Sequence, residues 1–339
     1  MTLALVTGAT GFIGTHVVRA LRNEGVSVRA LVRPETSAAR LADEAVEVVP
    51  GNVTEPPSVI AAMADVDVVF HLAAHYGLTS AAAQQIAAVN VEGTRTVMQA
   101  AMTEGVQLVV HTSSVAAVGH TDAAGAPATE ATWTDPREFA GPYEASKYDS
   151  ERIVQRMIAR DGLRAIVVNP TAPIGPLDVK PTPTGQMILD AARGTMPGYL
   201  AGAGLNIVHV RDVAMGHLLA WQRGQIGARY ILGNQDGNLT LQQILERAAA
   251  AAGRSGPRLR IPYAAALAYA HLDERILSRF QDRPVRAPIA GVRLAKHRMW
   301  FDCTRAVTEL GLPQTPLEDA FSDAVQSFID RGLVRRPEV

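Results

Sequence analysis

The chain has 339 residues, of which 19% are charged, and a formal net charge of −1. That length suits one α/β nucleotide-binding domain with a smaller second lobe. Without an overall excess of positive charge there is no electrostatic case for nucleic acid or an anionic membrane surface as a partner. The single cysteine, Cys303, excludes an intrachain disulfide and any site built from several thiolates.

Residues 3–7 already have the apolar pattern of a strand, which leaves no room for the charged and apolar regions of a signal peptide. No apolar stretch approaches the roughly 20 residues that a membrane-spanning helix needs. We therefore expect a cytoplasmic protein without an integral membrane segment.

A glycine-rich turn follows this first strand. Gly8, Gly11 and Gly14 stand between the apolar run 3–7 and a helical pattern at 12–23. Glycine permits a tight turn and a close approach of backbone to phosphate, and the helix N-terminus supplies free N–H groups and a partial positive charge. The position of these glycines, more than their spacing, predicts a site for the pyrophosphate of a dinucleotide.

The N-terminal half alternates strand-like and helix-like segments. Strands are predicted at 3–7, 27–32, 46–49, 66–72, 106–112 and 164–168, and helices near 12–23, 57–64, 83–103 and 142–160. This alternation is typical of a doubly wound parallel sheet. The predicted fold class is therefore α/β of the Rossmann type.

Prolines and glycines become frequent after Pro170, where we expect a smaller, discontinuous C-terminal substrate lobe to begin. Strands predicted at 207–210 and 230–232 flank a helix at 211–224, which indicates a return to the first sheet. The dinucleotide-binding domain is then 1–170 with about 205–235, and the lobe is about 171–204 with about 236–335. Helices predicted at 240–252 and 263–280 should pack against the pocket, which we favour over contact with lipid.

Tyr143 and Lys147 are four residues apart in a predicted helix that begins at Pro142, so their side chains share one helix face. The chain has only three lysines against 29 arginines, so a chance lysine at this spacing is rare. An ammonium beside a phenol stabilises the phenolate, so Lys147 can tune Tyr143 as a general acid or base.

The predicted strand 106–112 runs into Thr112, Ser113 and Ser114, at the edge of the sheet where an open α/β fold places its ligand. A hydroxyl there can reach a substrate oxygen. No metal site is expected, because His71 ends a strand and does not share a helix face with His75.

Four motifs in this order resemble the extended short-chain dehydrogenase/reductase superfamily, which includes the NAD-dependent epimerase/dehydratase family. They are Thr-Gly-Ala-Thr-Gly-Phe-Ile-Gly at 7–14, His-Leu-Ala-Ala at 71–74, Thr-Ser-Ser at 112–114 and Tyr143-x-x-x-Lys147. The resemblance implies that Tyr143 is the general acid/base and that Ser114 hydrogen-bonds the reacting oxygen. It also implies that Lys147 holds the nicotinamide ribose and lowers the pKa of the tyrosine, and that Asn90 supports the site.

Within that superfamily the chain is most similar to the dihydroflavonol 4-reductase-like proteins, and among those to the hopanoid-associated sugar epimerases. The segments 169–176 and 180–185 and the stretch from Gly291 onward carry this resemblance. The subgroup name refers to genomic association rather than to a chemistry that the residues themselves indicate.

Two arginines bear on the choice of cofactor. Arg33 stands where an NAD-specific fold has an acidic residue for the ribose hydroxyls, and its guanidinium suits a 2′-phosphate instead. Arg40 stands where the dihydroflavonol-reductase-like pattern has a second cation. Asn52 replaces the family's usual aspartate, a stronger acceptor for the adenine amino group. NADP(H) is therefore favoured, with NAD(H) as the alternative.

The resemblance also implies the remaining contacts. Besides the residues already named, it implies cofactor binding by Thr10, Phe12, Ile13, Val53, Leu72, Ala73, Ala74, Thr112, Ser113 and Pro170. His75, Tyr76 and Thr171 are candidates for contact with a small-molecule carbonyl or sugar substrate. The helices at 83–103 and 142–160 could form a homodimer.

Three functions fit these residues. Arg33 favours an NADP(H)-dependent reductase, in which Tyr143 protonates the oxygen of a ketone or aldehyde and the reverse reaction oxidises the alcohol. The alternative is an NAD-dependent sugar-nucleotide epimerase or dehydratase, as the subgroup name implies. A non-catalytic dinucleotide-binding redox sensor is a lesser alternative, against which the set of Ser114, Tyr143 and Lys147 argues.

Overall fold

The computed structural model describes residues 2–77, 82–121, 125–278, 285 and 287–335. Its main sheet has seven strands in the order β10-β6-β5-β4-β1-β2-β3, and every neighbouring pair is parallel. These strands are β1 (Leu3–Thr7), β2 (Ser27–Val32), β3 (Glu47–Pro50), β4 (Val68–His71), β5 (Leu108–Thr112), β6 (Ala165–Pro170) and β10 (Arg229–Leu232). The predicted doubly wound α/β fold is confirmed.

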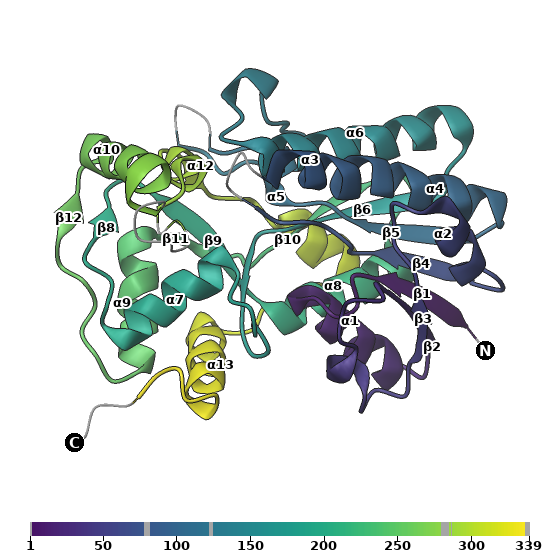
Figure 1. Cartoon of the computed structure of the whole chain (residues 1–339), viewed down its shortest axis with the longest axis horizontal. Coiled ribbons are helices and arrows are strands. Elements are labelled where there is room, and N and C mark those ends of the chain that lie inside the picture. The colour runs from purple at the N-terminus through teal and green to yellow at the C-terminus, as the bar shows by residue number, and fades with distance from the viewer. Residues whose placement is uncertain (1, 78–81, 122–124, 279–284, 286, 336–339) are drawn as a thin grey trace.

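Helices cover both faces of this sheet (Figure 1). On one face, α1 (Phe12–Asn23) packs beside α8 (Val210–Arg223). The other face carries α2 (Pro56–Ala62), α4 (Gly93–Thr103) and α6 (Pro142–Asp161). Burial on both sides explains why the central strand β4, Val-Val-Phe-His, is almost continuously apolar.

Local sequence signals set the bounds of several helices. Pro142 occupies the first turn of α6, where its missing N–H is not needed, and Gly162 ends the helix with φ +77°. The long helix predicted at 83–103 is divided into α3 (Ala83–Ile86), the π-helical turn η3 (Ala87–Glu92) and α4. Short 3₁₀ turns lie at η1 (Ala39–Leu41) and η4 (Pro136–Glu138).

The smaller lobe is built on a second sheet of β7 (Ala172–Ile174), β9 (Gly204–His209), β11 (Asn238–Thr240) and β13 (Arg298–Met299). Its own apolar core joins α7 (Pro183–Arg193), α9 (Leu241–Ala251) and α13 (Leu317–Asp330). The strands β8 (Tyr199–Leu200) and β12 (Arg260–Ile261) pair with each other. The remaining elements are α10 (Tyr263–Leu272), η5 (Asp273–Leu277), α12 (Ile289–Leu294) and η6 (Ala306–Leu310).

The chain's return to the main sheet begins later than the sequence predicts. The strand expected at 207–210 is β9, which pairs with β7, β11 and β13 rather than with the main sheet. Helix α8 and strand β10 make the return, because α8 packs on α1 and β10 pairs with β6. The end of the helix predicted at 263–280 lies partly outside the described residues. None of the helices in the described ranges is long and apolar enough to cross a membrane.

Candidate active site

A cavity of about 620 Å³ lies between the carboxyl edge of the main sheet and the smaller lobe. Both lobes contribute to its wall: Gly8, Ser114 and Tyr143 come from the sheet side, and Leu205, Met299 and Phe301 come from the lobe. This is the edge where an open α/β fold places its ligand.

Most of the site residues predicted from the sequence line this cavity, and the others lie around or behind it. Those in the wall are Gly8, Gly11, Phe12, Ile13, Gly14, Leu72, Ala74, Tyr76, Thr112, Ser113, Ser114, Tyr143, Pro170 and Thr171. Those outside the wall are Thr10, Arg33, Arg40, Asn52, Val53, Ala73, His75, Asn90 and Lys147.

The glycine loop leaves no room for side chains. Gly8 has φ +74°, and a Cβ there would lie 2.7 Å from the backbone nitrogen of Ala73. A Cβ at Gly14 would lie 2.1 Å from the carbonyl oxygen of Gly8. The Gly11 N–H donates to that same carbonyl at 2.9 Å, which tightens the turn ahead of α1. This bare backbone in front of a helix N-terminus fits the pyrophosphate of a dinucleotide.

Of the two arginines of the predicted NADP(H) site, Arg40 contacts the glycine loop, and Arg33 follows β2, the strand that pairs with β1. Arg40 donates from Nη1 to the carbonyl oxygen of Thr10 at 2.9 Å, which ties η1 to the loop. Arg33 directly follows β2, and its Nε lies 3.4 Å from a carboxylate oxygen of Glu35 in an exposed pair. Exposed pairs of this kind are weak, so the Arg33 guanidinium can exchange Glu35 for a phosphate.

Asn52 and Val53 follow β3 and are held by local contacts. The Asn52 side-chain oxygen accepts from the backbone N–H of Thr54 at 3.2 Å. Val53 is buried in the core on the α4 side of the sheet, where a Cβ at Gly93 would meet it at 2.8 Å. Asn52 therefore shapes a turn, and Val53 is a core residue.

Asn90 lies in the π-helical turn η3 and fastens the segment after β4. Its side-chain oxygen accepts from the His75 backbone N–H at 2.7 Å, and its amide donates to the His75 carbonyl at 3.0 Å and to the Ser146 hydroxyl at 2.9 Å. Ala73 in the same segment donates its N–H to the Thr7 hydroxyl. Asn90 thus joins α6 to the backbone beside the cavity.

Tyr143 projects from the first turn of α6 next to Ser114. Burial raises the pKa of Tyr143 to about 12, and a hydrogen bond with Ser114 opposes part of that rise. The ring of Tyr76 lies over Tyr143, with 4.4 Å between the ring centroids. Ser114 is also the N-cap of the short helix α5 (Val115–Val118). The phenol therefore keeps its proton at neutral pH, in contact with the serine.

Lys147 lies one helical turn behind Tyr143 and is buried. Its Nζ donates to the carbonyl oxygen of Thr112 at 3.0 Å. Burial lowers the pKa of Lys147 to about 8, and the charge of Glu151 opposes that fall. The resemblance implied that Lys147 lowers the pKa of Tyr143, but the causes of the Tyr143 shift are burial and Ser114.

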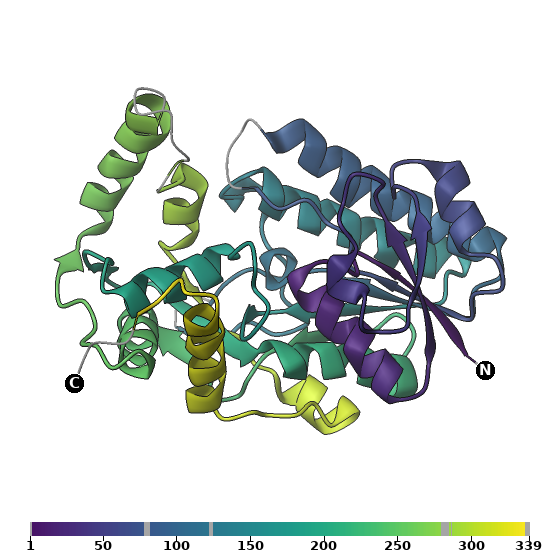
Figure 2. The same ribbon diagram turned by 60° about the horizontal axis from the view of Figure 1, so that its bottom comes forward.

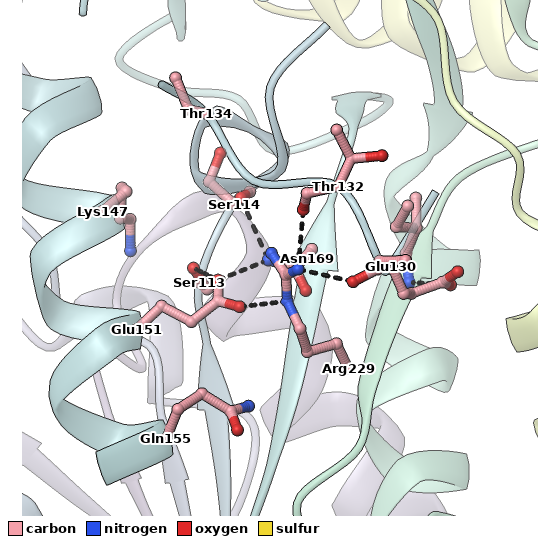
Figure 3. A network of polar contacts seen from close by, with 12 residues as sticks. Ser113, Ser114, Glu130, Thr132, Thr134, Lys147, Glu151, Gln155, Asn169 and Arg229 are labelled. Atoms are coloured by element: carbon pink, nitrogen blue, oxygen red, sulfur yellow. Dashed lines mark hydrogen bonds and ion pairs between the residues drawn. The ribbon is translucent and has the colours of Figure 1, made fainter. Parts of the chain in front are cut away.

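A polar network behind the site contains residues that the sequence prediction missed. Glu151, one turn beyond Lys147, is fully buried and pairs with Arg229 from β10 (Figure 3). It also accepts from the Ser113 hydroxyl and, at 2.8 Å, from the Asn169 amide. Its i, i+4 spacing from Lys147 could have identified Glu151. No pattern in the sequence indicates that Arg229 belongs to the site.

Arg229 joins this network to the loop before η4. It donates to the carbonyl oxygens of Glu130 and Thr132, and its guanidinium lies 3.8 Å from the centre of the Trp133 ring. Asn169 in turn donates to the carbonyl oxygen of Ser114 at 3.1 Å. The arrangement links α6, β5, β6 and β10 at the point where Ser114 stands (Figure 3).

The smaller lobe contributes a mostly apolar part of the cavity wall, with Lys180, Asn206 and three threonines as its described polar residues. The apolar residues there include Leu205, Ala290, Leu294, Met299 and Phe301. Of the described wall residues, Lys180 is the only cation and Glu144 the only acid. Arg293 and Arg298 are exposed and lie outside this wall. No group of three or more His, Cys, Asp or Glu that could hold a metal occurs in the described part of the chain.

Comparison with known proteins assigns the chain to a family. The model of the NAD dependent epimerase/dehydratase family matches residues 4–233. The chain belongs to this family. It is 39% identical to a Synechocystis sp. protein provisionally named dihydroflavonol 4-reductase, over 97% of the chain and 95% of the relative. It is 38% identical to sterol demethylase protein B of Methylococcus capsulatus, over 97% and 99%.

A solved structure extends the agreement to the whole fold. The crystal structure of gox2253 covers 99% of this chain and all of its own, with 40% identity and a TM-score of 0.87. The predicted membership of the epimerase/dehydratase family, with a dihydroflavonol-reductase-like relative, is confirmed. The family is named for NAD-dependent epimerases and dehydratases, and the Synechocystis relative is named as a reductase.

Proposed function

We propose that the protein is an NADP(H)-dependent oxidoreductase that reduces the carbonyl of an apolar ketone or aldehyde, and oxidises the corresponding alcohol in reverse. The observation that carries this proposal is the pair of arginines after β2, one of which contacts the glycine loop. Arg33 follows β2 in place of an acidic residue, and Arg40 is bonded to Thr10 of the loop. Two guanidinium groups there favour a ribose that carries a 2′-phosphate.

The residues around Tyr143 can supply the proton that reduction needs. A bound NADPH provides the hydride. Ser114 Oγ and Tyr143 Oη can donate hydrogen bonds to the carbonyl oxygen, where negative charge develops. Because burial raises the pKa of Tyr143 to about 12, the phenol is protonated at neutral pH and is ready to act as a general acid. Lys147, held on the Thr112 carbonyl, places a cation behind this pair.

The apolar wall favours a carbonyl compound over a nucleotide sugar. A nucleoside diphosphate carries charges that require cations or several hydrogen-bond donors. In the described part of the wall only Lys180 is cationic, and the other polar side chains from the smaller lobe are Asn206 and three threonines, while Leu205, Met299 and Phe301 offer apolar contact. The names of the two relatives, which refer to a dihydroflavonol and a sterol, are consistent with an apolar substrate.

An epimerase of sugar nucleotides is the second candidate. The name of the family favours it, and Ser114, Tyr143 and Lys147 would serve both reactions. In that reaction the tyrosine must first accept a proton, which a raised pKa makes harder. A non-catalytic redox sensor would bind the dinucleotide without turnover.

The test is titration of the protein with NADPH and NADH, followed by assays with apolar ketones and aldehydes and with UDP-glucose. We expect tighter binding of NADPH and turnover of a carbonyl compound. The variant Arg33→Ala should bind NADPH at least about 10-fold more weakly and leave NADH affinity unchanged, whereas Arg40→Ala also removes the hydrogen bond to Thr10 and should weaken the binding of both dinucleotides. Tightly held NAD⁺ with turnover of UDP-glucose would establish the epimerase, and cofactor binding without any turnover would establish the sensor.

A further inference from the structure

Helix α10 has an apolar surface that no described residue covers. Its ten residues, Tyr-Ala-Ala-Ala-Leu-Ala-Tyr-Ala-His-Leu, include no acidic residue, lysine or arginine. A helix that is apolar on all sides is expected to be buried on all sides. Within α10, all of which the structure describes, only Ala270 is buried.

Five of the exposed residues form one stripe that continues into η5. Ala265, Ala268, Tyr269, Leu272 and Ile276 are exposed and recur at spacings that place them on one helix face. Tyr269, Leu272 and Ile276 are 44%, 44% and 45% exposed. We call these five residues the outer stripe. Exposed apolar surface of this kind marks a site of contact with a protein or a membrane.

The opposite side of the same helix faces α12. Asp273 accepts from the backbone N–H of Ala287 at 3.0 Å, and Glu274 accepts from that of Ile289 at 2.8 Å. Asp273 and Glu274, the two acidic residues of η5, are thereby turned toward the segment that begins α12, away from the outer stripe. Ala290 and Leu294 of α12 line the cavity, whereas no residue of α10 does, so α12 lies between α10 and the candidate active site (Figure 2).

The surrounding segment is strongly basic. Residues 258–298 contain nine arginines and lysines against three acidic residues, a net charge of +6 in a chain whose total is −1. Arg258 and Arg260 are exposed just before α10, and Arg275 is exposed beside Ile276. None of the ion pairs among described residues involves these three arginines.

We propose that the outer stripe docks the protein on a membrane surface that contains anionic lipid. The apolar side chains enter the boundary between headgroups and acyl chains, and the unpaired arginines meet lipid phosphates. An anionic lipid surface complements both features: its acyl chains cover the apolar stripe, and its phosphates neutralise the arginines. The homodimer expected from the sequence would use α4 and α6, which lie on the main sheet. Because α10 belongs to the smaller lobe, that dimer would leave the outer stripe exposed. This inference does not depend on which reaction the cavity performs.

Co-sedimentation of the full chain with vesicles tests the proposal. Vesicles of phosphatidylcholine with phosphatidylglycerol should bind the protein, vesicles of phosphatidylcholine alone should bind it at least about 10-fold more weakly, and added salt should release it. The double variant Leu272→Gln/Ile276→Gln should lose at least about 10-fold in binding. Ile60→Gln and Ile226→Gln, at isoleucines that are 41% and 45% exposed elsewhere, are the matched controls and should bind as wild type does.

Circular dichroism and NADPH titration would show that each variant is folded, because neither measurement requires the proposed docking or turnover. Absence of binding to the anionic vesicles would overturn the proposal, as would equal binding of the double variant and the wild type. A wild-type homodimer that the double variant dissociates in analytical ultracentrifugation would also overturn it, since a second copy would then occupy the stripe.

Discussion

The hydroxyl of Tyr143 is the proton donor of the proposed reaction. Replacement of Tyr143 by Phe removes the proton donor but keeps the ring that packs on Tyr76. We expect kcat/KM for carbonyl reduction to fall by about 100-fold or more, and NADPH affinity to stay within about 2-fold. Steady-state kinetics and fluorescence titration measure the two effects separately. Tyr76→Phe removes a neighbouring hydroxyl and should cost much less; equal losses in the two variants would contradict the role given to Tyr143.

Gly8 offers a second test at the scale of one residue. Gly8→Ala combines a positive φ of +74° with a Cβ that would lie 2.7 Å from Ala73 N. Gly25→Ala is a matched control, because Gly25 has φ +73° and nothing within 4 Å of its Cβ position. Both should lose about 1–2 kcal/mol to backbone strain. Only Gly8→Ala should lose further stability in urea unfolding and bind NADPH at least 10-fold more weakly.

At the scale of elements, α6 carries Tyr143, Lys147 and Glu151 on successive turns, and the charge of Glu151 raises the pKa of Lys147 against the effect of burial. Glu151→Gln should therefore lower that pKa below about 8. If protonated Lys147 is required for turnover, the basic limb of the kcat/KM profile must move to lower pH. The pH dependence of NADPH-driven reduction measures this shift.

Stability complicates that variant, because Glu151→Gln leaves the Arg229 cation buried without its partner. We expect a loss of about 3–5 kcal/mol in the free energy of unfolding. The double variant Glu151→Gln/Arg229→Gln removes both charges and should recover most of that loss while keeping the displaced pH profile. A wild-type profile in the double variant would show that Glu151 has only a structural role.

The sequence predicts elements best where the signal is local. The glycines after β1, the Tyr143–Lys147 spacing and the alternation of strands and helices all depend on neighbouring residues, and the main sheet has the predicted form. The assignment of β9 failed because a short apolar run such as Ile207–His209 can pair in either sheet, and long-range packing decides which. Arg229 could not be predicted either, because its partner Glu151 is 78 residues away in the sequence and only long-range packing brings them together.

At the scale of the whole molecule, the net charge does not show how the charges are distributed along the chain. A net charge of −1 gave no case for an anionic surface, yet residues 258–298 carry +6. The helix predicted at 263–280 was expected to pack against the pocket, and α10 does contact α12, of which Ala290 and Leu294 line the cavity. The exposed side of α10 depends on what the rest of the chain leaves uncovered, which composition and periodicity do not reveal.

Buried histidines make the stability of the whole fold depend on pH. Burial lowers the pKa of His71 to about 3 and that of His16 and His217 to about 4. His71 is hydrogen-bonded to Thr7 of the neighbouring strand β1 and to Thr94 of α4, and the His111 ring is stacked on it with 5.4 Å between ring centroids. These imidazoles are neutral in the folded protein at pH 5, whereas in the unfolded chain they titrate near 6.5.

Because the folded-state pKa values lie below the unfolded one, the unfolded chain binds more protons between about pH 6.5 and 4, and the free energy of unfolding falls as the pH falls through that range. Each such histidine contributes up to about 1.4 kcal/mol per pH unit. Urea unfolding of wild type and His217→Gln at pH 7 and pH 5 isolates one of these contributions. Glu130, Glu144 and Asp178 have raised pKa values that act in the opposite direction, but their contributions are the same in both proteins and cancel in the comparison. The variant should lose less stability between the two pH values than the wild type, and equal losses would mean that His217 is protonated in the folded protein.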